Sequence, residues 1–110
     1  MSVVALALAA GATLAQPAPP ATVTDEVHDG RRLYTSYCTR CHGVNLVSSG
    51  GAFFDLRTFP RDDKERFMRS VKEGKRAMPA WGGIIKPPEM EAIWAYIGSV
   101  NGWTDAANPK

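Results

Sequence analysis

The sequence has no hydrophobic run long enough to span a bilayer comfortably. Its apolar N-terminal stretch covers only residues 1–15, whereas a spanning helix needs about 20 apolar residues. The chain also lacks a marked excess of charge of one sign. Its formal net charge is +2 over 110 residues, which argues against a nucleic-acid partner. No segment alternates convincingly between apolar and polar residues, as a half-buried strand would. These absences favour a single, helical domain.

The N-terminal stretch MSVVALALAAGATLA, residues 1–15, is typical of the apolar core of a secretory signal peptide. Small residues at Thr13 and Ala15 precede Gln16, although no Lys or Arg stands in front of the run. Residues 16–24 follow as a Pro/Ala-rich linker. We therefore predict a signal peptide over residues 1–15. The alternatives are an apolar helix that belongs to the domain and an uncleaved membrane anchor.

The remaining chain divides into a domain over residues 25–102 and a short tail over residues 103–110. A hydrophobic core of this size is marginal unless a staple, a metal or a large cofactor supports it. Caps and apolar periodicity predict three helices, over residues 25–37, 62–73 and 87–100. The third helix carries a one-sided apolar stripe, formed by Met90, Ile93, Trp94, Ile97 and Val100.

Both cysteines of the chain lie in one short motif, CTRCH, at residues 38–42. A zinc site usually needs a second, separate pair of ligands, and His28 alone does not supply it. A redox dithiol normally opens a helix after a strand, and no such strand is predicted here. The order Cys-x-x-Cys-His is the attachment signature of c-type haem. Cys38 and Cys41, three residues apart on a helical turn, can reach two vinyl groups of one porphyrin, and His42 then faces the iron.

The second axial ligand of such a haem decides what the centre can do. The candidates are Met68, Met78, Met90 and His28. Met68 and Met90 lie on apolar helical stripes, where methionine ordinarily packs in a core, and His28 suits a solvated surface position. Met78 instead lies in the loop GKRAMPAWGG, directly before a stiff proline. We predict His42 and Met78 as the iron ligands, a pair that leaves no open coordination site and suits electron transfer.

The chain resembles the class I, mono-haem c-type cytochromes over about residues 30–100. GRRLYTSYCTRCHG is similar to the first helix and haem motif of that family, EAIWAYI to its C-terminal helix and AMPAW to its axial-methionine loop. The resemblance implies a small all-α cytochrome c fold, with three or more helices wrapped around one covalently bound haem c and with the N- and C-terminal helices crossing. Gly30 and Tyr34 take the places of the family's glycine and aromatic residue, and Tyr96 is expected to pack across the first helix near Gly30.

One stretch departs from the pattern of that family. Many members have a proline whose carbonyl accepts a hydrogen bond from the ligand histidine, whereas here Phe54 stands before Asp55-Leu56 in SSGGAFFDLRTFP. An acceptor for His42 is still expected, because a ligating histidine usually has one. The sequence leaves open which carbonyl supplies it.

The same loop, together with MPAWGG, is similar to small cytochromes that accompany quinoprotein (PQQ) alcohol dehydrogenases. This narrower resemblance implies a periplasmic carrier that accepts electrons from a dehydrogenase, and the His/Met ligand pair predicts that the protein is not itself an enzyme. A PQQ-dependent alcohol dehydrogenase would be its donor, and a cytochrome or terminal oxidase its acceptor. Two alternatives stay open: a haem enzyme or gas-binding protein with an open iron site, and a haem subunit fixed in a larger dehydrogenase complex.

Residues 57–76 carry eight basic and four acidic side chains, a local excess of four positive charges. One interpretation is a solvated helix with ion pairs one turn apart, such as Glu65 with Arg69. The other is a basic rim near the haem that steers an acidic redox partner. Arg57 and Trp81 are each candidates to bind a haem propionate.

Overall fold

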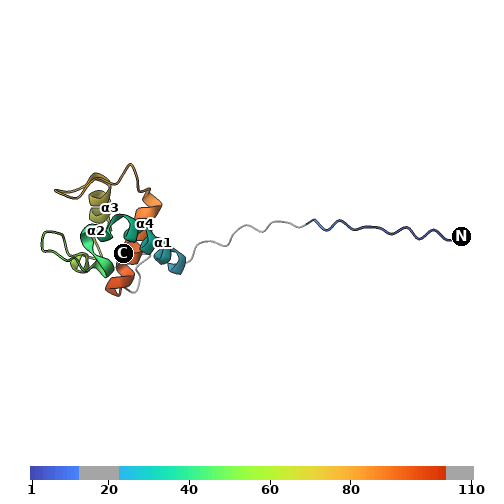
Figure 1. The fold of residues 1–110 in the computed structure, drawn as a ribbon, viewed down its shortest axis with the longest axis horizontal. Helices are drawn as coiled ribbons and strands as arrows, with labels where there is room; N and C mark the ends of the chain where they lie inside the picture. Colours follow the sequence, from blue (N-terminus) through green and yellow to red (C-terminus); the bar gives the residue numbers. More distant parts are fainter. Residues whose placement is uncertain (13–22, 104–110) are drawn as a thin grey trace.

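The computed structural model of the chain describes residues 1–12 and 23–103. Its helices are α1 (Val23–Tyr37), the single-turn α2 (Thr39–His42), α3 (Lys64–Glu73) and α4 (Pro87–Asn101), and two 3₁₀ turns, η1 (Val44–Leu46) and η2 (Leu56–Thr58), lie between α2 and α3. Within the described residues there is no β-strand, only an isolated bridge between Lys75 and Met78. Figure 1 shows α1 and α4 side by side in the middle of the domain. The all-α prediction is confirmed.

The first residues of α1 and α3 differ from the predicted ones by two positions. α1 begins at Val23, so the last two residues of the predicted linker are helical. α3 begins at Lys64, two residues later than predicted, because the Asp63 side chain accepts a hydrogen bond of 3.3 Å from the Arg66 amide and so caps the helix there. α4 begins at Pro87, as predicted, and ends before Gly102, whose φ of 75° lies in the left-handed region.

The two long helices cross at Gly30, where any side chain would be excluded. An ideal Cβ built on Gly30 would lie 1.8 Å from the Ala92 carbonyl oxygen and 2.9 Å from the Tyr96 Cβ. One turn farther along α1, the Tyr34 ring packs on the Tyr96 ring at a centroid distance of 5.2 Å. The predicted crossing of the terminal helices, with Tyr96 across the first helix near Gly30, is therefore confirmed.

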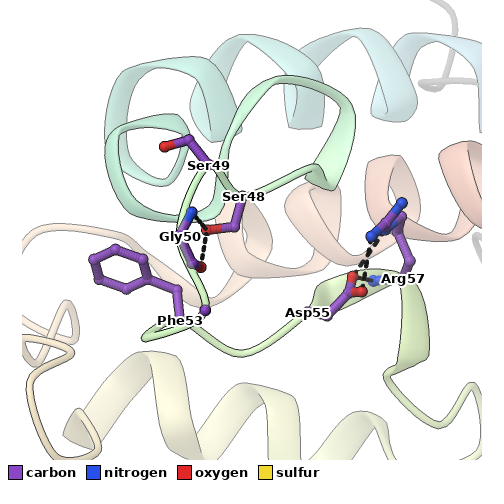
Figure 2. Close-up of a pocket in the computed structure, with 7 residues that line it drawn as sticks. Ser48, Ser49, Gly50, Phe53, Asp55 and Arg57 are labelled. Atoms are coloured by element: carbon purple, nitrogen blue, oxygen red, sulfur yellow. Dashed lines mark hydrogen bonds and ion pairs between the residues drawn. The ribbon is translucent and has the colours of Figure 1, made fainter.

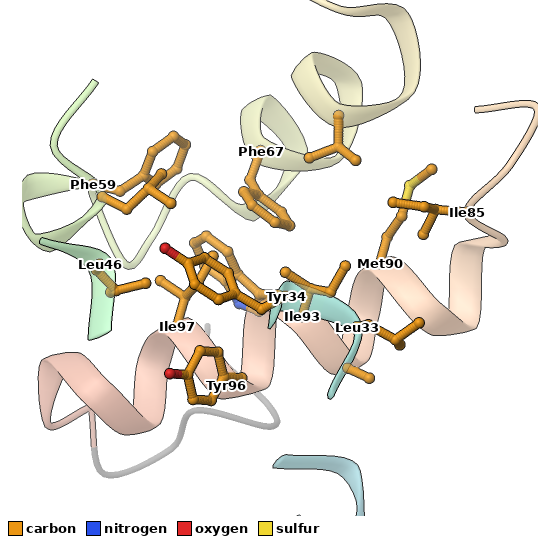
Figure 3. Packing of buried hydrophobic residues seen from close by; sticks show 14 residues of the cluster. Leu33, Tyr34, Leu46, Phe59, Phe67, Ile85, Met90, Ile93, Tyr96 and Ile97 are labelled. Atoms are coloured by element: carbon orange, nitrogen blue, oxygen red, sulfur yellow. The ribbon is translucent and has the colours of Figure 1, made fainter. Parts of the chain in front are cut away.

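α4 is the centre of the hydrophobic core, and it is buried on more than one face. Besides Met90, its buried residues form an unbroken run, Ala92, Ile93, Trp94, Ala95, Tyr96, Ile97 and Gly98. α1 covers the face that carries Tyr96, while Phe67 points from α3 toward the other side of α4 (Figure 3). The predicted one-sided stripe therefore includes too few of the buried residues of α4. Its last member, Val100, is 37% exposed. A helix covered on several sides loses the one-sided pattern of a surface helix.

The structure describes the first 12 residues of the chain and ends its description at Trp103. Residues 1–12 form neither helix nor strand, and their side chains are exposed, so the predicted signal peptide stays a prediction. Residues 13–22 and 104–110 lie outside the described residues. Trp103, placed by the sequence in the tail, packs on Trp94 at 4.9 Å between ring centroids and so belongs to the domain. No helix in the described part of the chain is both long and apolar enough to cross a membrane.

Candidate haem site

The cysteine motif folds as one helical turn directly after α1. The Cys38 amide donates to the Tyr34 carbonyl at 2.8 Å, which continues the hydrogen bonding of α1. The amides of Cys41 and His42 then both donate to the Cys38 carbonyl, at 3.2 and 2.9 Å. Residues three or four apart on a helix lie on the same side. The helical turn therefore keeps Cys38, Cys41 and His42 close together in the backbone, and both cysteines are free.

The environment of Cys38 disfavours a redox role for this cysteine pair. Cys38 packs against the hydrophobic core. Burial, with a smaller effect from the neighbouring Cys41 thiol, raises the pKa of Cys38 to about 12. A reactive cysteine needs a lowered thiol pKa, because the thiolate is the nucleophile. At neutral pH the Cys38 side chain is therefore a protonated thiol, unlike that of a thiol–disulfide enzyme.

His42 is held by a hydrogen bond that the sequence could not identify. Its Nδ1 lies 3.2 Å from the Phe54 carbonyl oxygen. A carbonyl can only accept, so Nδ1 carries the proton and the lone pair is on Nε2. Burial lowers the pKa of His42, and the hydrogen bond to the Phe54 carbonyl opposes this only in part. The ring is thus a neutral imidazole with Nε2 available to a metal, and Phe54 supplies the carbonyl that a proline provides in many class I cytochromes.

The loop that follows His42 has its own local order. Ser48 donates from its hydroxyl to the Gly50 carbonyl at 2.9 Å, and it lines an open hollow of about 380 Å³ together with Ser49, Gly50, Gly51, Phe53, Asp55 and Arg57 (Figure 2). Asp55 accepts from Arg57 Nε and Nη2, each at 2.9 Å, and lies across the hollow from Phe53. This fork holds the pKa of the Asp55 carboxyl below its usual value. Two of the Arg57 donors are thereby occupied, and propionate binding by Arg57 or Trp81 stays a prediction.

Met78 lies on a short arm that is anchored at both ends. The amide and carbonyl of Met78 pair with those of Lys75 at 3.0 and 3.1 Å. At the base of the arm Gly74 has a φ of +77°, and a Cβ there would lie 2.7 Å from the Met78 carbonyl oxygen. Only glycine can adopt this positive φ and also leave room for the Met78 carbonyl oxygen. The position of Met78 is therefore set by backbone geometry.

Trp81 ties the same arm to the rest of the domain. Its amide donates to the Val71 carbonyl of α3 at 2.8 Å. Its ring packs on the ring of Tyr37, which directly precedes Cys38, at a centroid distance of 5.3 Å. Met78, Trp81, Tyr37 and Cys38 are all partly buried against the same core. The arm that carries Met78 is thus connected to the helix end that carries the cysteine motif.

The other candidate ligands occupy less suitable places. His28 is exposed on α1, Met90 is buried in the core and Met68 packs partly buried against it. No cluster of three or more His, Cys, Asp or Glu side chains suited to a metal ion occurs in the described part of the chain. Of the four candidates for the second iron ligand, which are three methionines and one histidine, only Met78 lies in a loop.

Apart from Arg61, the basic residues of segment 57–76 divide into two groups. Ion pairs link Arg57 to Asp55, Lys64 to Glu91 and Arg66 to Asp63. The other group is exposed, and none of its members forms an ion pair with a described residue: Arg69, Lys72, Lys75 and Arg76. The ion pair between Glu65 and Arg69 that the solvated-helix interpretation offers is absent within the described residues, and α3 instead has an ion pair between Asp63 and Arg66. The unpaired positive charges therefore gather at the end of α3 and on the arm beside Met78.

Most of the chain is similar in sequence to one protein family. The family described as "Cytochrome C oxidase, cbb3-type, subunit III" matches residues 25–97, which covers α2 and the Met78 arm. The chain belongs to the c-type cytochromes. This cytochrome is 34% identical over 82 residues to cytochrome c6 of Nostoc sp., with 71% of this chain and 73% of that protein covered. No solved structure gives a significant match.

Two further relatives are much larger proteins. The cytochrome is 34% identical over 86 residues to quinohemoprotein alcohol dehydrogenase ADH IIB of Pseudomonas putida, covering 76% of this chain. It is 34% identical over 89 residues to 1-butanol dehydrogenase (cytochrome c) of Thauera butanivorans, covering 78% of this chain. The matched region spans only 12% of each dehydrogenase.

Membership of the family implies covalent haem c as the cofactor. The residues present fit this group. The chain offers two free thiols on one turn, a neutral imidazole with its Nδ1 proton already engaged, and a thioether on a fixed arm.

Proposed function

We propose that this cytochrome is a periplasmic one-electron carrier with a His/Met-ligated haem. Cys38 and Cys41 would form the two thioethers, and His42 and Met78 would be the two protein ligands of the iron. The observation that carries the proposal is the pre-set arrangement of both ligands. The Phe54 carbonyl engages Nδ1 of His42 and leaves Nε2 free for a metal, and the Lys75 bridge holds the Met78 backbone on its arm. When bound, the haem supplies one reversible oxidation step.

The residues around the site favour electron transfer over chemistry on a substrate. With His42 and Met78 both bound there is no open coordination position for a small molecule. Both ligands are held by contacts within the chain, so little rearrangement accompanies a change of oxidation state. Methionine ligation also raises the reduction potential. The protein is therefore proposed to be a carrier and not an enzyme.

The relatives guide the choice of donor and acceptor. Two of them are named alcohol or butanol dehydrogenases, one with "cytochrome c" in its name, and each includes a stretch similar to this chain. The donor is proposed to be a quinoprotein (PQQ) alcohol dehydrogenase, and the acceptor a cytochrome or a terminal oxidase. The match to most of a cytochrome c6 favours a free carrier. In each dehydrogenase the stretch similar to this chain is a small part of a larger protein. The second candidate is therefore a haem subunit fixed in a dehydrogenase complex.

Optical spectroscopy of the purified, haem-loaded protein tests the proposal. The ferric form must show the long-wavelength charge-transfer band of methionine-ligated iron, and the ferrous form must not bind carbon monoxide rapidly. An open iron site in either measurement would refute the carrier function and favour an enzyme or gas-binding protein. Gel filtration of a native periplasmic extract separates the free carrier from the fixed subunit by size.

The unpaired basic group beside Met78 is proposed to guide an acidic partner to the haem. Replacing Lys75 and Arg76 with Glu should slow oxidation by a small anionic iron complex roughly tenfold at low ionic strength, because local charge changes the encounter rate. The same change should speed oxidation by a cationic cobalt complex. Stopped-flow rates at two salt concentrations measure both effects, and salt should reduce them.

The matched control for this charge reversal is the pair Arg31 and Arg32 on α1. Replacing both with Glu changes the net charge by the same amount at exposed positions distant in sequence from Met78. This control should alter the rates much less. Equal changes in the two variants would mean that only the total charge matters, and the basic group would lose its proposed role.

A further inference from the structure

Phe54 occupies the position where many class I cytochromes have the proline that supports the ligand histidine. A proline holds its φ near −65°, which stiffens the backbone that carries the acceptor carbonyl. Phe54 has no such constraint, yet its carbonyl lies 3.2 Å from His42 Nδ1. Something else must hold this peptide group, and the structure offers contacts on both sides of it.

The first support is the Phe54 side chain. Its ring meets the Phe59 ring nearly edge-on, with centroids 5.8 Å apart and an interplanar angle of 70°. Arg66 of α3 places its guanidinium carbon 5.8 Å from the Phe54 centroid and 4.7 Å from the Phe59 centroid. Cation–aromatic and edge-to-face contacts of this kind are each attractive. Phe54 is 48% exposed, so its position depends on these few contacts and not on enclosure in the core.

The second support fixes the ring contacts to rigid parts of the domain. Phe59 is buried, and its ring packs on Trp94 of α4 at 5.6 Å and on Phe67 of α3 at 6.0 Å. Arg66 is held in turn by an ion pair of 3.7 Å with Asp63. The Phe54 ring thus rests on side chains that are themselves anchored by α3 and α4.

The third support acts from the other end of the same peptide group. Asp55 receives hydrogen bonds from the Arg57 side chain, and its carbonyl accepts from the Thr58 hydroxyl at 2.8 Å. Asp55 also accepts from the Arg57 amide at 3.0 Å and so caps η2. The Phe54–Asp55 peptide is therefore restrained by an aromatic ring before it and by a capped turn after it.

We infer that Phe54 is the positioning residue for His42, and that its ring, clamped by its contacts with Phe59 and Arg66, does in this chain what a proline ring does elsewhere in the family. A firmly held acceptor makes the imidazole a more basic ligand, because the Nδ1 proton is partly drawn away. A more basic ligand favours the oxidised iron. The clamp therefore lowers the reduction potential and slows exchange of the Nδ1 proton with solvent.

Replacing Phe54 with Ala removes the ring but keeps the carbonyl in the chain. In the haem-loaded protein this change should raise the reduction potential by about 59 mV, which is a tenfold change in a one-electron equilibrium constant. The Nδ1 proton should exchange roughly tenfold faster in NMR spectra of the reduced protein. Phe54→Pro should return both values to near those of the wild type. No backbone hydrogen bond of the described loops uses the Phe54 amide as donor, so a proline removes none of them.

Phe53 offers the matched control. It is the adjacent phenylalanine, it is 41% exposed, and it lines the hollow shown in Figure 2 instead of the clamp. Phe53→Ala should leave the potential and the exchange rate unchanged. Equal shifts in Phe53→Ala and Phe54→Ala, or a Phe54→Pro protein that resembles Phe54→Ala, would overturn the inference.

Arg66→Lys tests the other side of the clamp at constant charge. Lysine keeps the positive charge but loses the planar guanidinium that lies over the rings. The potential should rise in the same direction as in Phe54→Ala and by less. Because the two residues act through one contact, Arg66→Lys should add nothing further in a Phe54→Ala background. Full additivity of the two shifts would contradict the clamp.

The inference rests on the proposed function only through His42 as an iron ligand, and the two can fail separately. A wild-type protein whose optical and NMR spectra show no histidine ligation would refute the proposed function. A wild-type protein with histidine ligation, but with a potential that Phe54→Ala does not shift, would refute the positioning role alone.

Discussion

Met78→Ala should convert this cytochrome from a closed carrier into a protein with an open iron site. The substitution removes the only loop-borne thioether among the candidate ligands, and nothing else on the arm can replace it: Arg76 and Lys75 are cationic and exposed. The ferric charge-transfer band should disappear, and the ferrous protein should bind carbon monoxide. The reduction potential should fall by roughly 120 mV or more, a hundredfold change in the one-electron equilibrium constant, because methionine ligation favours the reduced iron.

Met68→Ala is the control for this experiment. Met68 also carries a thioether and also packs partly buried, but it lies on α3 within the core contacts. Its loss should cost stability, by an amount typical of a partly buried side chain, and leave the iron spectra as they are. A charge-transfer band that persists in Met78→Ala but vanishes in Met68→Ala would show that the ligand assignment is wrong.

The parts of the site that sequence could predict are those specified by short stretches of chain. The CTRCH motif needs only one helical turn, so the meeting of Cys38, Cys41 and His42 follows from their spacing. The proposal of Met78 as an iron ligand also comes from local sequence, since Met78 stands outside every apolar helical stripe. The arm itself could not be foreseen, because it depends on a positive φ at Gly74 and on a Trp81 ring that meets a distant helix end.

What sequence could not predict arises from contacts between segments far apart in the chain. The acceptor for His42 lies 12 residues later, in a loop whose only regular structure is a single turn of 3₁₀ helix at each end. A propensity argument has no means of bringing the Phe54 carbonyl to that ring. The pattern of α4 misleads for a similar reason, because Gly30 lets α1 approach so closely that the helix is covered where a one-sided stripe predicts solvent.

The approach of α1 to α4 leads to the largest expected effect on stability, from Gly30→Ala. The new Cβ would meet the Ala92 carbonyl oxygen at 1.8 Å, a backbone atom that cannot move without displacing α4. Overpacking of this kind costs about 3 kcal/mol at the upper end of its usual range. Alanine is the better helix former by about 1 kcal/mol, which offsets only part of that cost. The free energy of unfolding should therefore fall by about 2 kcal/mol, as measured by urea titration of the haem-loaded protein.

Gly83→Ala separates this steric effect from the general consequence of adding a methyl group. Gly83 has no atom within 4 Å of an ideal Cβ position, so the substitution should leave the free energy of unfolding nearly unchanged. The crossing also holds Tyr34 against Tyr96, and Tyr34 donates from its hydroxyl to the Gly43 carbonyl at 2.7 Å, directly after His42. A displaced α1 should therefore loosen the motif as well as the core, and Gly30→Ala should incorporate haem less efficiently than Gly83→Ala during expression. Unfolding of both variants at the same urea concentration would contradict this prediction. It would mean that the helix crossing tolerates a side chain at position 30 and that the close approach there does not determine the stability of the domain.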